Sequence, residues 1–283
     1  MLRKPRKMIE YHRAERYRPE QGFTVTVAGL ANMKSRGAFK SQRLYKVILS
    51  LRAPGLFYVK DPPASDQARF TASYDLRSPQ LAPRFQDPPH AFREEPIDDN
   101  QLVVLDVRFL KVDGKEITAV PEESSISPPC GAWGMLPAFV SGDVASGSFV
   151  VPLFSGPVPV EALKADNPMK FIMGKVRERH PNFRVLEGSS VVVQICNALL
   201  EDVLPPATKD PRLNYIFVKY VCDTAGISQE KYYYEQVEDG GLKSVGKLVP
   251  KGFKGSQEDF YQIANIRFAS ETGVEYTPSG PQR

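Results

Sequence analysis

The residues that could carry catalysis are few and scattered. The three histidines, His12, His90 and His180, have no nucleophile beside them, and the HExxH, GxSxG and phosphate-binding glycine patterns are missing. Each histidine is interpreted as a surface or cap residue. Adjacent Asp98 and Asp99 are interpreted as a cap at the entry of the following strand, with a general acid as the alternative. The sequence therefore predicts a protein that is not an enzyme and has no small-molecule substrate and no cofactor.

The cysteines do not form a recognisable site. Cys130, Cys196 and Cys222 are an odd number, are far apart and include no CxxC pair. This pattern supports neither a disulfide framework nor a zinc site, so each cysteine is interpreted as a small buried hydrophobic residue. We expect a reducing compartment.

Basic residues gather in two stretches, although the net charge of the chain is only +4. Residues 1–20 hold seven Lys or Arg against three glutamates, and the loop from Ala31 to Leu44 has four cations and no acid. The candidate partner-binding residues are Arg3, Lys4, Arg6, Lys7, Lys34, Arg36, Lys40 and Arg43. Three interpretations stay open: a solvated surface, a contact with an acidic protein, and a contact with an anionic membrane. Aromatic residues do not interleave with these cations, so nucleic acid is not expected as a partner.

Alternating segments dominate the chain and predict strands. In Gln101–Leu110, Val103, Leu105 and Val107 alternate with residues of the other face, as in a strand with one face in a core. Pro137 and Pro152 remove ladder donors and predict strands that lie at an edge or are bulged there. The full set of predicted strands is Phe23–Leu30, Tyr45–Arg52, Arg69–Tyr74, Gln101–Leu110, Gly131–Val140, Ser148–Phe154, Ser190–Cys196 and Asn214–Cys222.

Two helices are predicted between and after these strands. Asn167–His180 has an asparagine cap, a proline at the first position and basic residues near its end. Ser256 is placed to cap a short helix through Ile263. We predict an all-β protein: an antiparallel β-sandwich with one or two short helices. Its three parts are a basic arm (1–21), the sandwich (22–200) and an extended C-terminal segment (201–283).

The C-terminal segment contains a cluster of three tyrosines, Tyr232 to Tyr234. The cluster suits either an interface anchor or a strand that covers the sandwich. The segment itself is expected to pack on the sandwich or on a neighbouring protein.

Six segments, FTVTVAGL, YKVILSL, NQLVVLDVRFL, GAWGMLPAF, GSFVVPLF and SSVVVQIC, together resemble an eight-stranded C2 domain over Gly22 to Leu200. The opening GFTVTV and the pairing of GAWGMLPAF with SGSFVVPLFSG are similar to the C2-like region of the ciliary coiled-coil domain-containing protein seventeen family. This chain lacks the coiled coil of that family. Any role of the coil is therefore not carried over.

The resemblance also allows a test for calcium. C2 domains that bind calcium use aspartates from the loop after the first strand and from an Asp-x-Asp set after a later strand, since the ion needs six to eight oxygens. Here the first loop is basic, and Asp113 stands alone after the corresponding strand. No metal is expected.

What the resemblance implies is a non-enzymatic structural or interaction component of a ciliary or flagellar axoneme, located in the cytoplasm and cytoskeleton. Its partners would be tubulin or other axonemal proteins on the microtubule doublets. The alternative is a calcium-independent C2 module that binds anionic membrane surfaces. No apolar run approaches the length of a membrane span, and no signal peptide is predicted.

Overall fold

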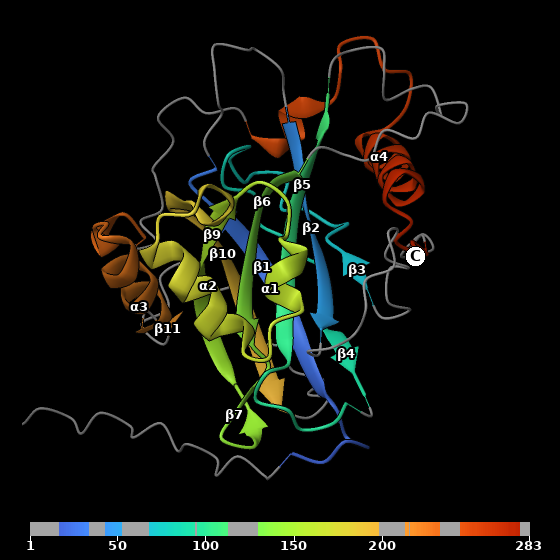
Figure 1. The fold of residues 1–283 in the computed structure, drawn as a ribbon. Helices are drawn as coiled ribbons and strands as arrows, with labels where there is room; N and C mark the ends of the chain where they lie inside the picture. Colours follow the sequence, from blue (N-terminus) through green and yellow to red (C-terminus); the bar gives the residue numbers. More distant parts are fainter. Residues whose placement is uncertain are drawn as a thin grey trace, which may run out of the picture.

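An antiparallel β-sheet forms the centre of the molecule (Figure 1). The structure is a computed structural model and describes residues 17–33, 43–52, 68–93, 95–112, 130–197, 213–214, 216–232 and 244–277. The strands of the main sheet are β1 (Phe23–Ala31), β2 (Arg43–Arg52), β3 (Arg69–Phe70), β4 (His90–Phe92), β5 (Leu102–Lys111), β6 (Cys130–Pro137), β9 (Gly147–Ser155), β10 (Val185–Asn197) and β11 (Leu213–Asn214). Short β7 (Phe139–Val140) and β8 (Asp143–Val144) pair with each other. In the main sheet all neighbouring strands pair antiparallel except β11, which pairs in parallel with β9 off the main path. The prediction of an all-β, antiparallel fold is confirmed.

The main sheet is divided into two halves. Its strand order is β3-β2-β5-β6-β9-β10-β1-β4, and β6 and β9 pair only at Ala132 with Ser155 and at Trp133 with Phe154. Pro137, at the end of β6, and Pro152, in β9, both lie beyond these two pairs. At each proline, the pairing between β6 and β9 is therefore missing. This agrees with the expected interruption of the ladder at prolines.

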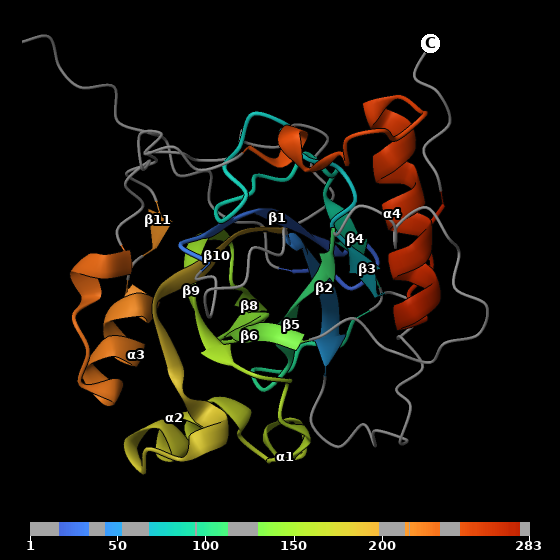
Figure 2. The same ribbon diagram turned by 90° about the horizontal axis from the view of Figure 1, so that it is seen from above.

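The sheet curves until its two edges approach each other. Figure 2 shows β3 and β4 on the same side of the molecule. Irregular bridges connect the edges, from Tyr74 to Phe85 and from Arg84 to Gly29. Only two residues of the segment expected as a strand at Arg69–Tyr74 are ladder-paired, and Tyr74 forms an isolated bridge.

The inner face of the curved sheet holds the largest apolar core. Val103, Leu105 and Val107 of β5 are fully buried there, as the alternation predicts. Facing them are buried residues of the other half, among them Val191 and Val193 of β10. Alternation with period two places these side chains on one face of each strand, and their removal from water is the main favourable term for the fold.

The outer face is covered by helices. These are α1 (Val160–Leu163), α2 (Pro168–Arg177), the 3₁₀ helix η1 (Pro181–Phe183), α3 (Ile216–Ala225) and the 3₁₀ helix η2 (Gln229–Tyr232). Beneath them Trp133 is fully buried and stacks on Phe154, with 4.4 Å between ring centroids. The second face of β5 and β6 is thus also a core, which explains why Leu102 and Val104 are apolar.

The prediction of a strand at Asn214–Cys222 is wrong. Only Leu213–Asn214 is extended, and α3 follows. Val218, Val221 and Cys222 are buried, whereas Tyr220 between them is half exposed. Burial at positions i, i+3 and i+4 is the pattern of a helix that lays one face on the sheet, and it outweighs the strand propensity of the valines and aromatics.

The helix predicted at Asn167–His180 is confirmed. The Asn167 side chain accepts a hydrogen bond from the Lys170 backbone N–H at 2.9 Å, and Pro168 occupies the first turn. His180 then caps η1, since its Nδ1 accepts from the Asn182 N–H. The described residues contain four α-helices in all, more than the one or two expected.

The C-terminal residues 244–277 pack on the sandwich. They form the 3₁₀ helix η3 (Val245–Leu248) and α4 (Gln257–Thr272), which lies beside β2 and β3 in Figure 2. Ser256 caps α4 and forms a capping box with Asp259, as expected, but the helix runs nine residues beyond Ile263. Of the two expected packing modes, contact with the sandwich is the one observed for this segment.

Candidate partner-binding surface

The loop predicted to bind a partner leaves the sandwich at the end where β1 and β5 finish and β2 begins. This follows from the antiparallel register, which places Arg43, the first residue of β2, directly opposite Lys111, the last residue of β5. We call these two residues the basic pair. Arg43 is the one candidate residue that the structure describes. The others, Arg3, Lys4, Arg6, Lys7, Lys34, Arg36 and Lys40, lie outside the described residues.

The Arg43 side chain is held by an aromatic ring. Its guanidinium carbon lies 4.3 Å from the centroid of the Phe109 ring, two residues before Lys111 on the facing strand. Stacking of a guanidinium on a ring leaves its N–H groups available in its own plane. Arg43 is partly exposed, so those donors are positioned to bind an anion at the surface.

Lys111 adds a second positive charge at this point. It is exposed, and among the described residues no carboxylate forms an ion pair with it or with Arg43. Like charges directly opposite each other on neighbouring strands destabilise a sheet. The basic pair is therefore a place where an anionic partner would relieve repulsion within the fold.

The sequence alone points to Arg43 but not to Lys111. The two are 68 positions apart in the chain, and only the strand register shows that they face each other. A pairing register is not readable from alternation alone, since a shift by two residues keeps the same faces inward. In the sequence, Lys111 is a single cation between Leu110 and Val112, so no local pattern marks it.

The other residues considered for chemistry have structural roles where they are described. Asp98 accepts a hydrogen bond from the Asn100 N–H at 2.8 Å, which confirms its role in the turn before β5. His90 lies in β4 with its ring 4.6 Å from that of Phe92. Tyr232 is buried, and its hydroxyl donates to the Leu186 carbonyl at 2.9 Å. Tyr232 therefore covers its own sheet and is not exposed as an interface anchor. Tyr233 and Tyr234, the other members of the predicted cluster, lie outside the described residues.

Cys196 and Cys222 are poor nucleophiles at neutral pH. Cys222 is fully buried, and burial, with a smaller contribution from Asp223, raises the pKa of its thiol to about 11. Burial also raises the pKa of Cys196. Since the thiolate is the reactive form, neither residue is primed for catalysis.

The most unusual ionisable group is Lys46 in β2, on the face of the strand opposite Tyr45 and Val47. It has no exposed surface. Its amine donates to Asn265 Oδ1 of α4 at 2.5 Å and to the Thr71 carbonyl at 3.1 Å. The rings of Phe70, Tyr74 and Phe268 surround the amine with centroids 5.0–5.7 Å from Nζ; these five groups are the Lys46 cage.

The electrostatics of the cage disfavour the charged form of the amine. Burial lowers the pKa of Lys46 to about 7, and the charge of Asp87 partly opposes this effect. The same burial raises the pKa of Asp87, whose Oδ1 accepts hydrogen bonds from the Ala72 and Ser73 N–H groups. A neutral amine has two N–H donors, which match the two acceptors.

Lysines with depressed pKa values act as nucleophiles in some enzymes. Here the amine has no surface that a substrate could touch. The arrangement instead connects α4 to the sandwich, because Asn265 also donates to the Ala72 carbonyl and to the Tyr276 hydroxyl. The Lys46 cage is therefore a structural connection.

Within the described ranges, no group of three or more His, Cys, Asp or Glu side chains could hold a metal ion. None of the helices in that part of the chain is both long and apolar enough to cross a membrane. No protein-family model matches the chain, and no curated protein matches it either.

Proposed function

We propose that this chain is a non-enzymatic structural component of a ciliary or flagellar axoneme, which binds tubulin or another acidic axonemal protein through the basic end of its sandwich. The axonemal location is supported by the resemblance of the six strand segments to the C2-like region of the ciliary family. The class of partner is supported by the basic pair.

The observation that carries the proposal is the juxtaposition of Arg43 and Lys111. Two cations face each other where the basic loop leaves the sheet, and no described carboxylate pairs with either. An acidic protein surface would supply the missing counter-charge. Electrostatic complementarity of this kind contributes mainly to specificity and association rate, and it weakens as salt rises.

Fractionation of cilia tests the location. The full chain, tagged and expressed in ciliated cells, should remain with axonemes after detergent removes the membrane. Recovery of the protein wholly in the membrane-and-matrix fraction would contradict the axonemal proposal. Attachment of the purified chain to anionic vesicles without other proteins would instead favour the membrane alternative.

Charge reversal tests the surface. The quadruple variant Lys34→Glu, Arg36→Glu, Lys40→Glu and Arg43→Glu should leave axonemes at lower salt than the wild type.

A double variant, Arg43→Glu with Lys111→Glu, tests the basic pair alone. Its matched control reverses the charge of Lys251 and Lys254, two exposed lysines before α4. Both doubles change the charge equally, so only a site at the basic pair would distinguish them. Equal salt sensitivity of the two doubles would show that the basic pair does not contact the partner.

A further inference from the structure

A second basic surface lies on α2, away from the loop after β1. Between Pro168 and Arg184 there are five Lys or Arg and one acid, Glu178, a net charge of +4 that equals that of the whole chain. The five cations are Lys170, Lys175, Arg177, Arg179 and Arg184. All but Lys175 are exposed, and Lys175 is partly exposed.

These cations are largely uncompensated. Lys175 pairs with Glu178 at 2.8 Å, and both side chains are accessible to solvent. The other four form no ion pair with any carboxylate in the described part of the chain. Exposed pairs contribute at most about 1 kcal/mol, so an incoming carboxylate can compete with Glu178 for Lys175.

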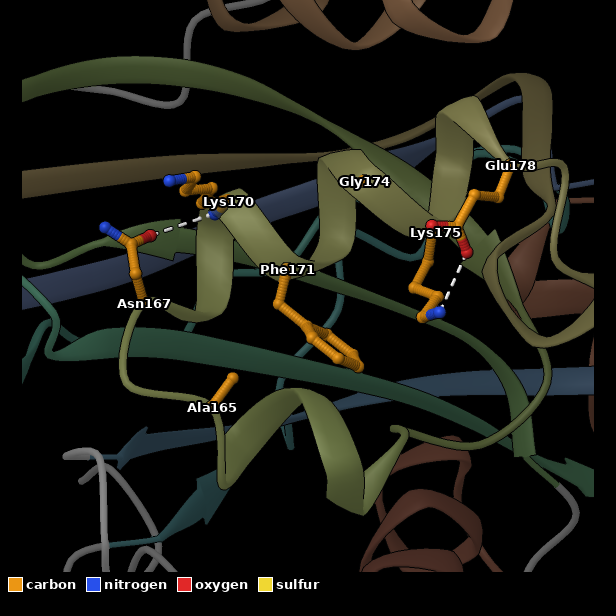
Figure 3. Close-up of a pocket in the computed structure, with 7 residues that line it drawn as sticks. All are labelled: Ala165, Asn167, Lys170, Phe171, Gly174, Lys175 and Glu178. Atoms are coloured by element: carbon orange, nitrogen blue, oxygen red, sulfur yellow. Dashed lines mark hydrogen bonds and ion pairs between the residues drawn. The ribbon is translucent and has the colours of Figure 1, made fainter.

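The same surface is hollowed. Figure 3 shows an open hollow lined by Asn167, Lys170, Phe171, Gly174, Lys175 and Glu178, with the Phe171 ring directed from α2 toward the segment that holds Ala165. Its volume is about 380 Å³, at the low end of ligand pockets. We call it the α2 hollow. Phe171 supplies an apolar floor, and the Lys175 ammonium lies over its ring, 5.7 Å from the centroid. Figure 3 shows the Lys170 side chain on the other side of the helix from that ring.

Gly174 keeps the hollow open. A side chain added at Gly174 would meet no atom within 4 Å. Lys170, Gly174 and Arg177 occupy positions i, i+4 and i+7, so they share one stripe of the helix with a gap between the two cations. A glycine inside a helix costs about 1 kcal/mol relative to alanine, and no local packing or left-handed turn requires it here.

The hollow also has a hydrogen-bond donor, the side-chain amide of Asn167. Asn167 uses its Oδ1 to cap α2, and no described residue accepts a hydrogen bond from its Nδ2 group. The hollow thus combines cations, an amide donor and an aromatic floor. This combination suits carboxylate side chains together with the peptide backbone between them.

We propose that the α2 hollow binds an acidic segment of a partner protein. The surface does not suit a membrane, because the apolar side of α2 is already used: Ile172, Met173 and Val176 are buried against the sheet. An amphipathic helix binds lipid through that face. A hollow also cannot be filled by a flat bilayer surface. The site is separate from the basic pair and does not depend on where the chain acts.

The test uses two variants that differ only in charge. Gly174→Glu places a carboxylate in the hollow, and Gly174→Gln places a side chain of the same shape without charge. Both should raise the melting temperature of the full chain, since glycine is replaced inside a helix with open space around it. Binding of a short fluorescent glutamate-rich peptide is then measured by anisotropy at low and at physiological salt.

We expect Gly174→Glu to weaken peptide binding at least about tenfold relative to Gly174→Gln, a difference of about 1.4 kcal/mol. Lys170→Ala with Arg177→Ala should weaken it more than the matched pair Lys251→Ala with Lys254→Ala. Equal affinities of the Glu and Gln variants would overturn the proposal. So would failure of the wild type to bind the peptide while it binds anionic vesicles or single-stranded RNA. A variant that fails to fold is recognised by its melting curve, and the other pair then decides.

Discussion

The amine of Lys46 donates a hydrogen bond at 2.5 Å to the side-chain oxygen of Asn265, a residue 219 positions later in the chain. The contact connects the second strand of the sandwich to the last helix. Around it, Phe70 packs on Phe268 with 4.9 Å between ring centroids, and Tyr74 packs on Tyr261 at 5.5 Å. Docking of α4 thus rests on an aromatic cluster with a buried, hydrogen-bonded polar pair at its centre.

A double-mutant cycle should show that this contact is energetically coupled. Asn265→Leu removes one acceptor of the buried amine, and Lys46→Met removes the donor and leaves the Thr71 carbonyl without it. Each single change should lower the free energy of unfolding by about 1–3 kcal/mol, because a buried polar group loses its partner. In the double variant, the loss of free energy of unfolding should be smaller than the sum of the two single losses by about 0.5–3 kcal/mol. Urea denaturation measures all four proteins, and strict additivity would contradict the coupling.

Stability should depend on pH through Lys46. The folded-state pKa of Lys46 is about 7 and its ordinary value is 10.5. Between these values the unfolded state holds more protons than the folded state, so raising the pH favours folding. We expect the free energy of unfolding of the wild type, minus that of Lys46→Met, to rise between pH 7 and 10.5 by up to about 1.4 kcal/mol per pH unit.

The comparison with Lys46→Met removes the contributions of the tyrosines near the amine. Burial raises the pKa of Tyr74 and of Tyr261, and both residues are present in both proteins, so their contributions largely cancel in the difference. Burial also raises the pKa of Asp87, but the charge of Lys46 lowers it, so the difference reports the Lys46–Asp87 pair. A difference that stays flat from pH 7 to 9.5 would mean that the aromatic rings keep the amine protonated in the folded state.

Sequence alternation located most of the sheet because each strand has an apolar inner face. Val103, Leu105 and Val107 were assigned to a core, and all three are fully buried there. Alternation places Lys46 on the face of its strand opposite Val47, together with Ile48 and Ser50. What it could not show is that α4, more than 200 positions later, covers that face. Burial of a charged residue depends on a long-range contact, which no local pattern records.

The helix α3 shows a different limit of prediction from sequence. Its residues, IFVKYVCDTA, are rich in types that favour strands, so propensity predicted a strand. The helical spacing of Val218, Val221 and Cys222 was present in the sequence but is short. In contrast, α2 carried an explicit cap at Asn167 and a proline in its first turn, and both proved correct. Capping chemistry is local, and it was the more reliable signal.

The outer core predicts the behaviour of the single tryptophan. Trp133 is fully buried between Phe154, at 4.4 Å, and Phe183, at 5.9 Å between centroids. Its fluorescence emission should lie at short wavelength in the folded protein and move to longer wavelength on unfolding. Trp133→Ala should lower the free energy of unfolding by about 3–5 kcal/mol, because removal of this large buried ring leaves a cavity beneath α1 and α2. Emission typical of exposed tryptophan in the native protein would contradict the placement of these helices.

The α2 hollow implies a gain in stability from a single small substitution. Gly174 has no atom within 4 Å of an added Cβ and does not adopt a left-handed backbone conformation. Gly174→Ala should therefore raise the free energy of unfolding by about 0.5–1 kcal/mol. Gly188→Ala is the contrasting control: its φ is +77°, and a Cβ there would lie 3.1 Å from the Lys231 carbonyl oxygen. That variant should be less stable than the wild type, and thermal denaturation of the two variants compares them directly.

The basic pair should show opposed effects on stability and on binding. Lys111→Glu replaces a cation opposite Arg43 with an anion, so the cross-strand interaction changes from repulsive to attractive. The free energy of unfolding should rise by about 0.2–1 kcal/mol, and the gain should shrink at high salt. Lys111→Gln removes the repulsion without adding attraction, so its stability should lie between those of the wild type and Lys111→Glu.

The order of affinity for tubulin should run the other way if Arg43 and Lys111 form a surface for an acidic partner. The wild type should bind most tightly, followed by Lys111→Gln and then Lys111→Glu, as measured by microtubule co-sedimentation of the full chains. A Lys111→Glu protein that is more stable and binds microtubules as well as the wild type would remove Lys111 from the contact, and loss of stability in Lys111→Glu would show that the two side chains do not interact.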